Sequence, residues 1–287
     1  MQAMIMQVRK EDIRYIETTP LRVVHHMVSA LRGPLSPHWH EEIELDYVMN
    51  GSVIYIVNGV TYQVSQGEIA VMNSGAIHSG IWGKYERIED TAAEVLTVLL
   101  DIKLFEPYCK GEIPIFQTFL REEENAALRR IMTDLGIAFL RGDAYYELFL
   151  SASALMLCHC LLVNHRLPAG EDRSVQDNSL GEIKKALRFI EEHCAEKLTL
   201  EDAASVMNYN PAYFSRRFHQ LTGFTFSDYL NRCRVKAAAS RLRDSDETVS
   251  DIAFSCGFPC TKSLITYFKR QFGTTPERYR REKRAIR

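Results

Sequence analysis

The sequence has few of the features that mark a secreted or membrane-spanning protein. Its 287 residues include seven cysteines, an odd number, and most of these lie in apolar helical patterns. A small secreted domain held by disulfides is not arranged in this way. The amino terminus has no basic start followed by a long apolar core, so we expect no signal peptide, and no apolar run of about eighteen residues is present to span a membrane. These absences predict a cytoplasmic protein with free thiols.

The chain also lacks a strong net charge, but its two halves differ in sign. The formal net charge is −2, yet residues 1–178 carry 15 basic against 24 acidic side chains, whereas residues 179–287 carry 20 against 13. A chain of this length has room for about two domains. The asymmetry indicates that the carboxyl-terminal half contacts phosphates and that the amino-terminal half does not.

The same helical unit occurs twice in the last ninety residues, about fifty residues apart. The matched positions are Ala204 and Ala253, Asn208 and Gly257, Phe214 and Leu264, Phe218 and Phe268, and Gly223 and Gly273. Asn208 and Gly257 fall where the turn needs a left-handed backbone, which these residue types tolerate best. The repeat predicts two helix–turn–helix units. A helical solenoid is the alternative, but solenoids repeat three or more times at shorter periods.

The second helix of each unit has one face for the core and one for DNA. Its apolar residues are spaced i, i+4, which anchors one side of the helix. The opposite face carries Ala212, Ser215 and Arg216 in the first unit and Lys262, Ser263 and Thr266 in the second. Such a helix lies in the major groove with its early residues on base edges. These six residues are our candidates for reading double-stranded DNA.

The amino-terminal half has the period of β-strands from about residue 20 to 102. We expect strands at Val23–Val28, Ile43–Met49, Val53–Val57, Val60–Val64, Ile69–Met72 and Val95–Asp101. Asn58-Gly59 between two of them is a strong hairpin signal, because both residues accept a positive φ. Several short strands in close succession predict an antiparallel sandwich or barrel.

The period then changes to that of α-helices over about residues 122–164. Two apolar stripes, Leu128–Phe139 and Tyr145–Leu162, predict a helical hairpin. One stripe is enough to cover the barrel, so we expect the other to form a homodimer seam. Residues 165–178 are rich in proline, glycine and charge, which is typical of a linker.

The predicted architecture is therefore α+β in two domains. Residues 1–164 are expected to form an antiparallel β-barrel with a helical hairpin. Residues 179–287 are expected to be all-α, with two helix–turn–helix units joined by a long helix over Phe226–Leu242.

The carboxyl-terminal motifs resemble the DNA-binding domain of the AraC/XylS family over about residues 180–281. The resemblance rests on Leu198–Ala204, Asn210–Phe218, Gly257-Phe258 and Phe268–Arg280. It implies two recognition helices in successive major grooves on one side of the DNA. The chain departs from the family at Leu264, where phenylalanine is usual, and at Thr266, where arginine is frequent. Threonine reaches less far and cannot fork onto guanine, so we expect the second helix to read less sequence.

The amino-terminal half resembles a cupin. The matching residues are Gly33, His38-Trp39-His40, Glu44 and Gly51, followed by Gly67, Gly75 and His78. Asn73 and Trp82 depart from the pattern. The resemblance implies that the three histidines and Glu44 meet inside the barrel, and strand alternation puts His38, His40 and Glu44 on one face.

Three imidazoles and one carboxylate suit Fe, Mn, Ni or Zn. The alternative is a metal-free pocket in which His38, His40, Glu44, His78 and Trp82 bind a polar effector. No second shell is visible in the sequence, so we expect no cofactor and keep a divalent metal as the less favoured reading.

These features predict a transcription regulator controlled by a small-molecule effector, and not an enzyme. We expect an activator, which would contact RNA polymerase. Aromatic residues in the strand segments favour a sugar as the effector. Two alternatives stay open: a metal-dependent cupin oxygenase or isomerase fused to a DNA-binding tail, and an architectural DNA binder without a ligand.

Overall fold

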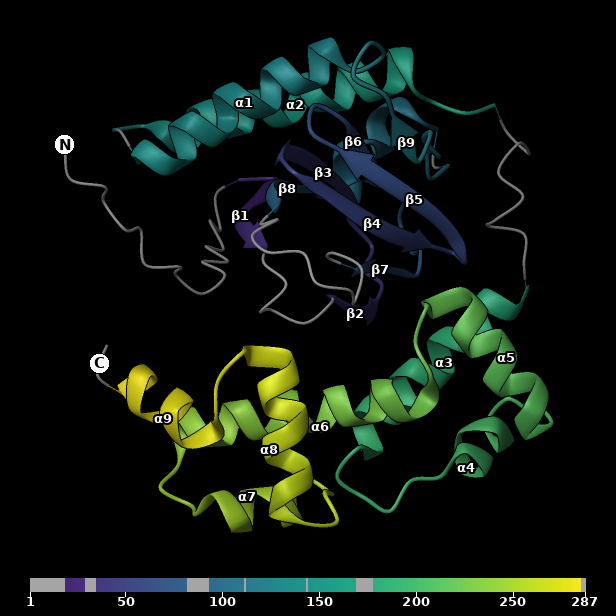
Figure 1. Ribbon diagram of the computed structural model, residues 1–287. Helices are drawn as coiled ribbons and strands as arrows, with labels where there is room; N and C mark the ends of the chain where they lie inside the picture. The colour runs from purple at the N-terminus through teal and green to yellow at the C-terminus, as the bar shows by residue number, and fades with distance from the viewer. Residues whose placement is uncertain are drawn as a thin grey trace.

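The computed structural model describes residues 19–28, 35–81, 93–110, 112–142, 144–168 and 178–284. These ranges form an amino-terminal half of antiparallel strands covered by two helices, and a carboxyl-terminal half made of helices (Figure 1). This arrangement confirms the predicted succession of a sheet domain and a helical domain. Trp82 and residues 169–177, most of the predicted linker, lie outside the described residues.

Two antiparallel sheets make up the amino-terminal half within the described residues. One has the strand order β1-β8-β3-β6-β9, and the other has the order β2-β7-β4-β5. The strands are β1 (Leu21–Val28), β2 (Leu35–His38), β3 (Ile43–Asn50), β4 (Ser52–Val57), β5 (Val60–Ser65), β6 (Ile69–Met72), β7 (His78–Ile81), β8 (Ala93–Leu100) and β9 (Phe119–Leu120). Asn58 and Gly59 both have a positive φ and join β4 to β5 in a tight hairpin, as predicted.

The central strand β3 is buried on both faces. Ile43 and Leu45 belong to the core that the sheet shares with the helices, whereas Val48 belongs to the core between the two sheets. Glu44 and Asp46 alternate with the first two residues and therefore point between the sheets. The space between the sheets thus combines an apolar core with buried carboxyl groups.

Two helices, α1 (Ala126–Arg141) and α2 (Tyr146–Asn164), cover the outer face of the five-stranded sheet (Figure 1). The stripe predicted on α1 faces the sheet, since Leu128, Met132 and Leu135 are fully buried. On α2 a different set is buried, which includes Leu150, Leu157 and Leu161. By length and composition α2 could cross a membrane, but its buried face packs against the sheet as a core helix does.

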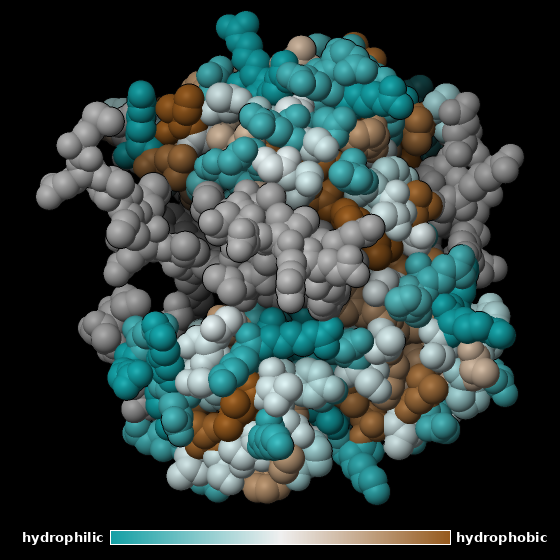
Figure 2. Space-filling view, in the orientation of Figure 1, coloured by the Kyte–Doolittle hydropathy of each residue, from teal (hydrophilic) through white to brown (hydrophobic). Residues whose placement is uncertain are grey.

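The stripe predicted on α2 faces mostly outward. Leu148 is 70% exposed, and Tyr145, Phe149 and Leu155 are also exposed. Figure 2 shows hydrophobic residues at the upper left, over the end of the pair where α1 passes into α2. The apolar surface that the sequence predicted for a partner is therefore on α2.

Seven helices make up the described carboxyl-terminal half, including the two predicted helix pairs and the long helix between them. They are α3 (Asn178–His193), α4 (Leu200–Ser205), α5 (Pro211–Thr222), α6 (Phe226–Asp244), α7 (Val249–Ser255), α8 (Thr261–Phe272) and α9 (Pro276–Arg284). Thr199, Thr225 and Thr248 each accept a hydrogen bond from the backbone N–H of an aspartate three residues later. Asn208 and Gly257 both have a positive φ in the turn between paired helices.

The two halves contact each other along β2, β7 and β4. The Ser79 hydroxyl donates to the carbonyl oxygen of Thr222 at 2.9 Å, and Nε of Arg232 donates to the hydroxyl of Ser36 at 2.7 Å. Ile77, immediately before β7, is fully buried in the core of the first helical unit. The contact therefore includes the two strands that carry the cluster residues, β2 with His38 and β7 with His78.

Candidate functional site

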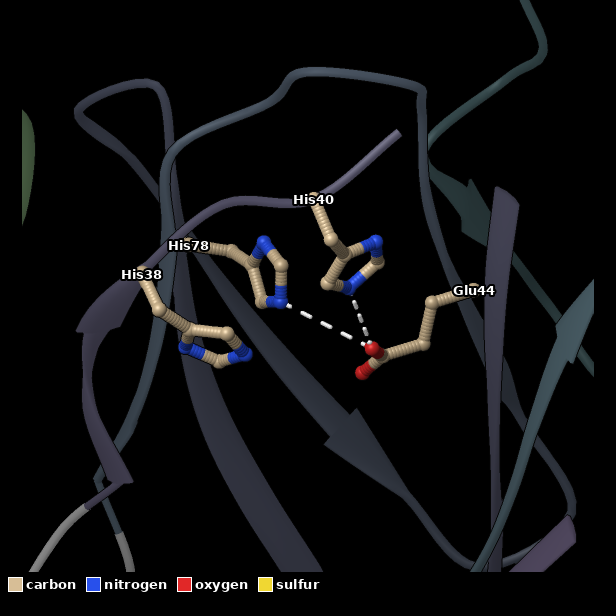
Figure 3. Close-up of side chains that lie close together, drawn as sticks. All are labelled: His38, His40, Glu44 and His78. Carbon is tan, nitrogen blue, oxygen red and sulfur yellow. Dashed lines mark hydrogen bonds and ion pairs between the residues drawn. The ribbon is translucent and has the colours of Figure 1, made fainter. Parts of the chain in front are cut away.

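The structure brings together the four residues that the sequence singled out, His38, His40, Glu44 and His78 (Figure 3). One donor atom from each lies within 4.8 Å of the others. His38 and His78 are cross-strand partners on β2 and β7, and Glu44 comes from β3 in the opposite sheet. The cluster therefore bridges the two sheets.

The reason why the residues meet differs from the predicted one. We expected His38, His40 and Glu44 to share the face of one strand, but β2 ends at His38 and β3 begins only at Ile43. The chain bends in the intervening segment and crosses from one sheet to the other. The expectation that the three residues share one strand was therefore wrong, although the expectation that their side chains meet was right.

Each histidine ring is fixed by its Nδ1 atom. In all three rings Nδ1 lies at hydrogen-bond distance from a backbone carbonyl oxygen two residues away. The distances are 2.9 Å from His38 to Ser36, 3.1 Å from His40 to Glu42 and 2.9 Å from His78 to Ala76. A carbonyl oxygen only accepts, so Nδ1 must be the donor in each ring. These contacts orient the rings.

The Nε2 atoms of His40 and His78 consequently point at Glu44 (Figure 3). Nε2 of His40 lies 2.8 Å from Oε2 of Glu44, and Nε2 of His78 lies 3.7 Å from the same oxygen. Nε2 of His78 is buried and has no hydrogen-bond partner within the described residues. The cluster therefore contains a polar atom whose bonding is incomplete.

The surroundings shift the protonation of the group. Burial, together with the neighbouring His78, lowers the pKa of His38 to about 3. Burial would raise the pKa of Glu44, but the contacts from His40 and His78 hold it well below its usual range. Burial would lower the pKa of His78, but the Glu44 carboxylate outweighs it and the pKa is raised. Glu44 is thus a buried negative charge whose partners are imidazoles.

Sequence analysis missed Asp46, which is also buried on the inner face of β3. Burial, reinforced by Glu44, raises the pKa of Asp46 to about 8, and the Thr97 hydroxyl donates a hydrogen bond to it. The signal that could have revealed it is its position two residues after Glu44, which puts both side chains on one face. Asp46 adds a second buried carboxyl group, with a raised pKa, beside the cluster.

Trp39 points away from the sheets and toward the helical half. Nζ of Lys184 lies 4.7 Å from the centre of its ring, and the Arg188 guanidinium lies 5.8 Å from it. The same ring lines a surface hollow with Lys185 and Phe189 on α3. Trp39 is therefore part of the contact between the halves. Trp82, the fifth residue expected at the effector site, is outside the described residues.

The six residues expected to read DNA lie on the second helices, α5 and α8. Ala212, Arg216, Lys262 and Thr266 are exposed, and Ser215 and Ser263 are half-buried. The opposite sides of the helices are fixed by Phe214, Phe218, Leu264 and Phe268, all fully buried. The two helices therefore expose the corresponding face to solvent, as the repeat predicted.

The hydroxyl of Thr266 already donates to the carbonyl oxygen of Lys262 at 2.9 Å. Arg216 makes no hydrogen bond or ion pair with any described residue. The first unit therefore carries the longer side chain, Arg216, and this side chain has no hydrogen bond to another described residue.

Comparison with known proteins agrees with both halves. A family model described as an AraC-like ligand binding domain matches residues 34–157, and a helix-turn-helix domain model matches residues 203–282. The HTH-type transcriptional activator RhaS of Klebsiella pneumoniae is 25% identical over 262 residues, which cover 87% of this chain and 88% of that protein. RhaS of Escherichia fergusonii is 28% identical over 266 residues, with the same coverage.

Among solved structures, the DNA-binding domain of the global transcriptional factor AdpA, in complex with a target DNA, is 33% identical. The match covers 37% of this chain and 96% of the AdpA chain, with a TM-score of 0.35. The two family models fall on the two structural halves, one on the sheets with their helices and the other on the paired helices. The chain therefore belongs to the AraC family of transcriptional regulators, with an amino-terminal ligand-binding domain and a carboxyl-terminal helix–turn–helix domain that binds DNA.

Proposed function

We propose that the protein activates transcription when a small polar molecule, with a sugar as the favoured class, binds between its two sheets. The observation that carries the effector site is the cluster of His38, His40, Glu44 and His78, which gathers buried polar groups where a ligand would lose its water. In this proposal the two sheets act as a cupin-like barrel around the effector. The protein would work in the cytoplasm, where its DNA is.

The DNA-binding part of the proposal assigns α4–α5 and α7–α8 as the two helix–turn–helix units. In each unit the second helix would enter the major groove, and α6 would hold the two at a fixed spacing. Ala212, Ser215, Arg216, Lys262, Ser263 and Thr266 would contact base edges. The RhaS relatives are transcriptional activators, which supports activation rather than repression. RNA polymerase would then be the protein partner.

We further propose that residues 1–164 form one domain that dimerises through α2, and that residues 179–287 form the other. Support for the dimer comes from Leu148, Leu155, Met156 and Val163, which expose more than half of their surface on one helix. An apolar surface of this kind marks an interaction site, and a homodimer brings two DNA-binding domains to one operator.

A thermal-shift screen of the full chain against sugars and other small polar molecules tests the effector site. A ligand held by the folded state raises the apparent Tm. With a ligand in hand, we expect Glu44→Gln to weaken its binding by about 1–3 kcal/mol, because hydrogen bonds of the ligand go unmade. His25→Ala is the matched control, since His25 pairs with Glu94 at 2.7 Å on another strand pair. Equal binding by both variants would mean that the effector binds outside the cluster.

A further inference from the structure

We propose that His38, His40, Glu44 and His78 bind one divalent transition-metal ion, through the three Nε2 atoms and the Glu44 carboxylate. This reverses the metal-free reading that the sequence favoured. That reading rested on the absence of a visible second shell, and the structure supplies one in the three carbonyl oxygens that face Nδ1. The inference concerns the ion alone and does not depend on the effector.

The first argument is the tautomer that the backbone imposes. Nδ1 of every ring donates to a carbonyl oxygen, so in a neutral ring the hydrogen is on Nδ1 and the lone pair is on Nε2. A histidine that ligates a metal typically has this arrangement, with its other nitrogen donating to a carbonyl or carboxylate. Two of the three lone pairs face a carboxylate that is itself only an acceptor.

The second argument is that protons alone leave the cluster unsatisfied. Nε2 of His40 could donate to Glu44 at 2.8 Å if that ring were charged. Nε2 of His78 could not, because the nearest Glu44 oxygen is 3.7 Å away, beyond hydrogen-bond distance. His78 is 1% exposed, so its side chain is shielded from bulk solvent. A cation at the centre would accept all the lone pairs at once.

The third argument is the chemistry and spacing of the donors. Imidazole nitrogen suits Zn, Ni, Cu and Fe, and one carboxylate is compatible with each of them. Bond lengths of about 2.0–2.2 Å place two donors on one ion at most about 4 Å apart, and the four donors here already lie within 4.8 Å. Small rotations of the side chains are enough to close the site.

The fourth argument is access. The side chain of His40 is 18% exposed, whereas those of Glu44 and His78 are 7% and 1% exposed. The cluster is thus open to solvent at one side and closed at the other, which gives an ion a path of entry. Because the donors come from both sheets, a bound ion would hold the sheets together at this point.

The test is a titration of the full chain, stripped with a chelator, with cobalt(II) chloride and with zinc chloride. We expect one ion per chain after dialysis, measured by elemental analysis, and a visible absorption band from cobalt bound to nitrogen and oxygen. Glu44→Gln and His40→Ala should each lower the affinity by at least about 100-fold, since even groups behind the ligands change affinity by about 10–100-fold. His25→Ala, which removes a histidine paired with a glutamate elsewhere, should bind like the unchanged chain.

Two results would overturn the proposal: no stoichiometric ion after dialysis, or undiminished binding by Glu44→Gln and His40→Ala. A thiolate-to-cobalt absorption band would place the ion on a cysteine and would also overturn the proposal. His38→Gln, at the half-buried end, is the second variant should His40→Ala fail to fold. A gel shift with the stripped protein measures DNA binding separately, so failure of the metal site and failure of the regulator function give different results.

Discussion

Arg216 combines the exposure and the freedom that base recognition requires. It projects from α5 on the face opposite the buried Phe214 and Phe218, and no described residue pairs with its guanidinium. Thr266, on the corresponding face of α8, has a shorter side chain whose hydroxyl is already bonded to the backbone. The two units therefore offer DNA different chemistry at related positions.

We expect Arg216→Ala to cost about 1–3 kcal/mol of specific DNA binding, because arginine can donate two hydrogen bonds to a guanine. Thr266→Ala should cost less, since it removes no group that is free to reach a base. Gel shifts at fixed salt on operator and random DNA measure both variants. Equal loss on the two DNAs would assign Arg216 to a phosphate, and a larger loss for Thr266→Ala would reverse the order that we expect.

Among the elements, α2 has two apolar faces, one packed against the sheet and one exposed. Leu150, Leu157 and Leu161 face the sheet, while Leu148 and Leu155 face solvent. We expect a change on the outer face to affect the proposed dimer and a change on the inner face to affect the fold. This separation corrects the expectation that Leu135 on α1 could belong to the seam, because Leu135 is fully buried inside the chain.

We expect Leu148→Asp to give a folded monomer, because it places an unpaired charge in the dimer seam. Leu135→Asp should instead lower the stability of the protein, since the charge enters its own core. Sedimentation and thermal melting together separate the two effects. A wild-type chain that is monomeric at high micromolar concentration would contradict the proposed seam.

Local sequence signals explain which helices and strands could be predicted. The capped helices were predictable because Thr199, Thr225 and Thr248 each precede an aspartate by three residues. The strands β2 and β7 were missed because they are four residues long and contain Pro37 and Gly80, which weaken a strand pattern. Pro37 is accommodated because β2 lies at the edge of its sheet.

The candidate site was predictable in its residues but not in its geometry. Motif spacing identified His38, His40, Glu44 and His78. The crossing from one sheet to the other and the bonds from Nδ1 depend on the backbone path, which no spacing encodes. Asp46 was missed because its burial follows from packing against the second sheet.

Over the whole molecule, the neighbouring strands β2 and β7 connect the cluster to the helices. His38 and His78 lie on these strands, and Ser36 and Ser79 on the same strands bond to Arg232 and to the Thr222 carbonyl. We therefore expect a ligand that moves either histidine to shift a contact with the DNA-binding half as well. In Figure 1 these strands lie on the side of the sheets that faces the carboxyl-terminal helices.

We expect Arg232→Ala to reduce the effect of a bound effector on DNA affinity, because it removes the hydrogen bond to Ser36. Arg243→Ala on the same helix is the control, since among the described residues Arg243 bonds to Ser240 and Asp244, which lie on the same helix. DNA affinity measured with and without effector gives the coupling. An unchanged ratio in Arg232→Ala would show that the signal passes elsewhere.

The burial of Ile77 among the helices has a consequence for how the protein unfolds. The core of the first helical unit includes this residue from the sheet half, whereas the core of the second is built from residues 235–279 alone. The first unit should therefore lose its amide protection together with the sheets, and the second should open as a separate cooperative unit. The two repeated units should thus differ in stability. The boundary between the parts that open separately should run along α6 rather than through the linker.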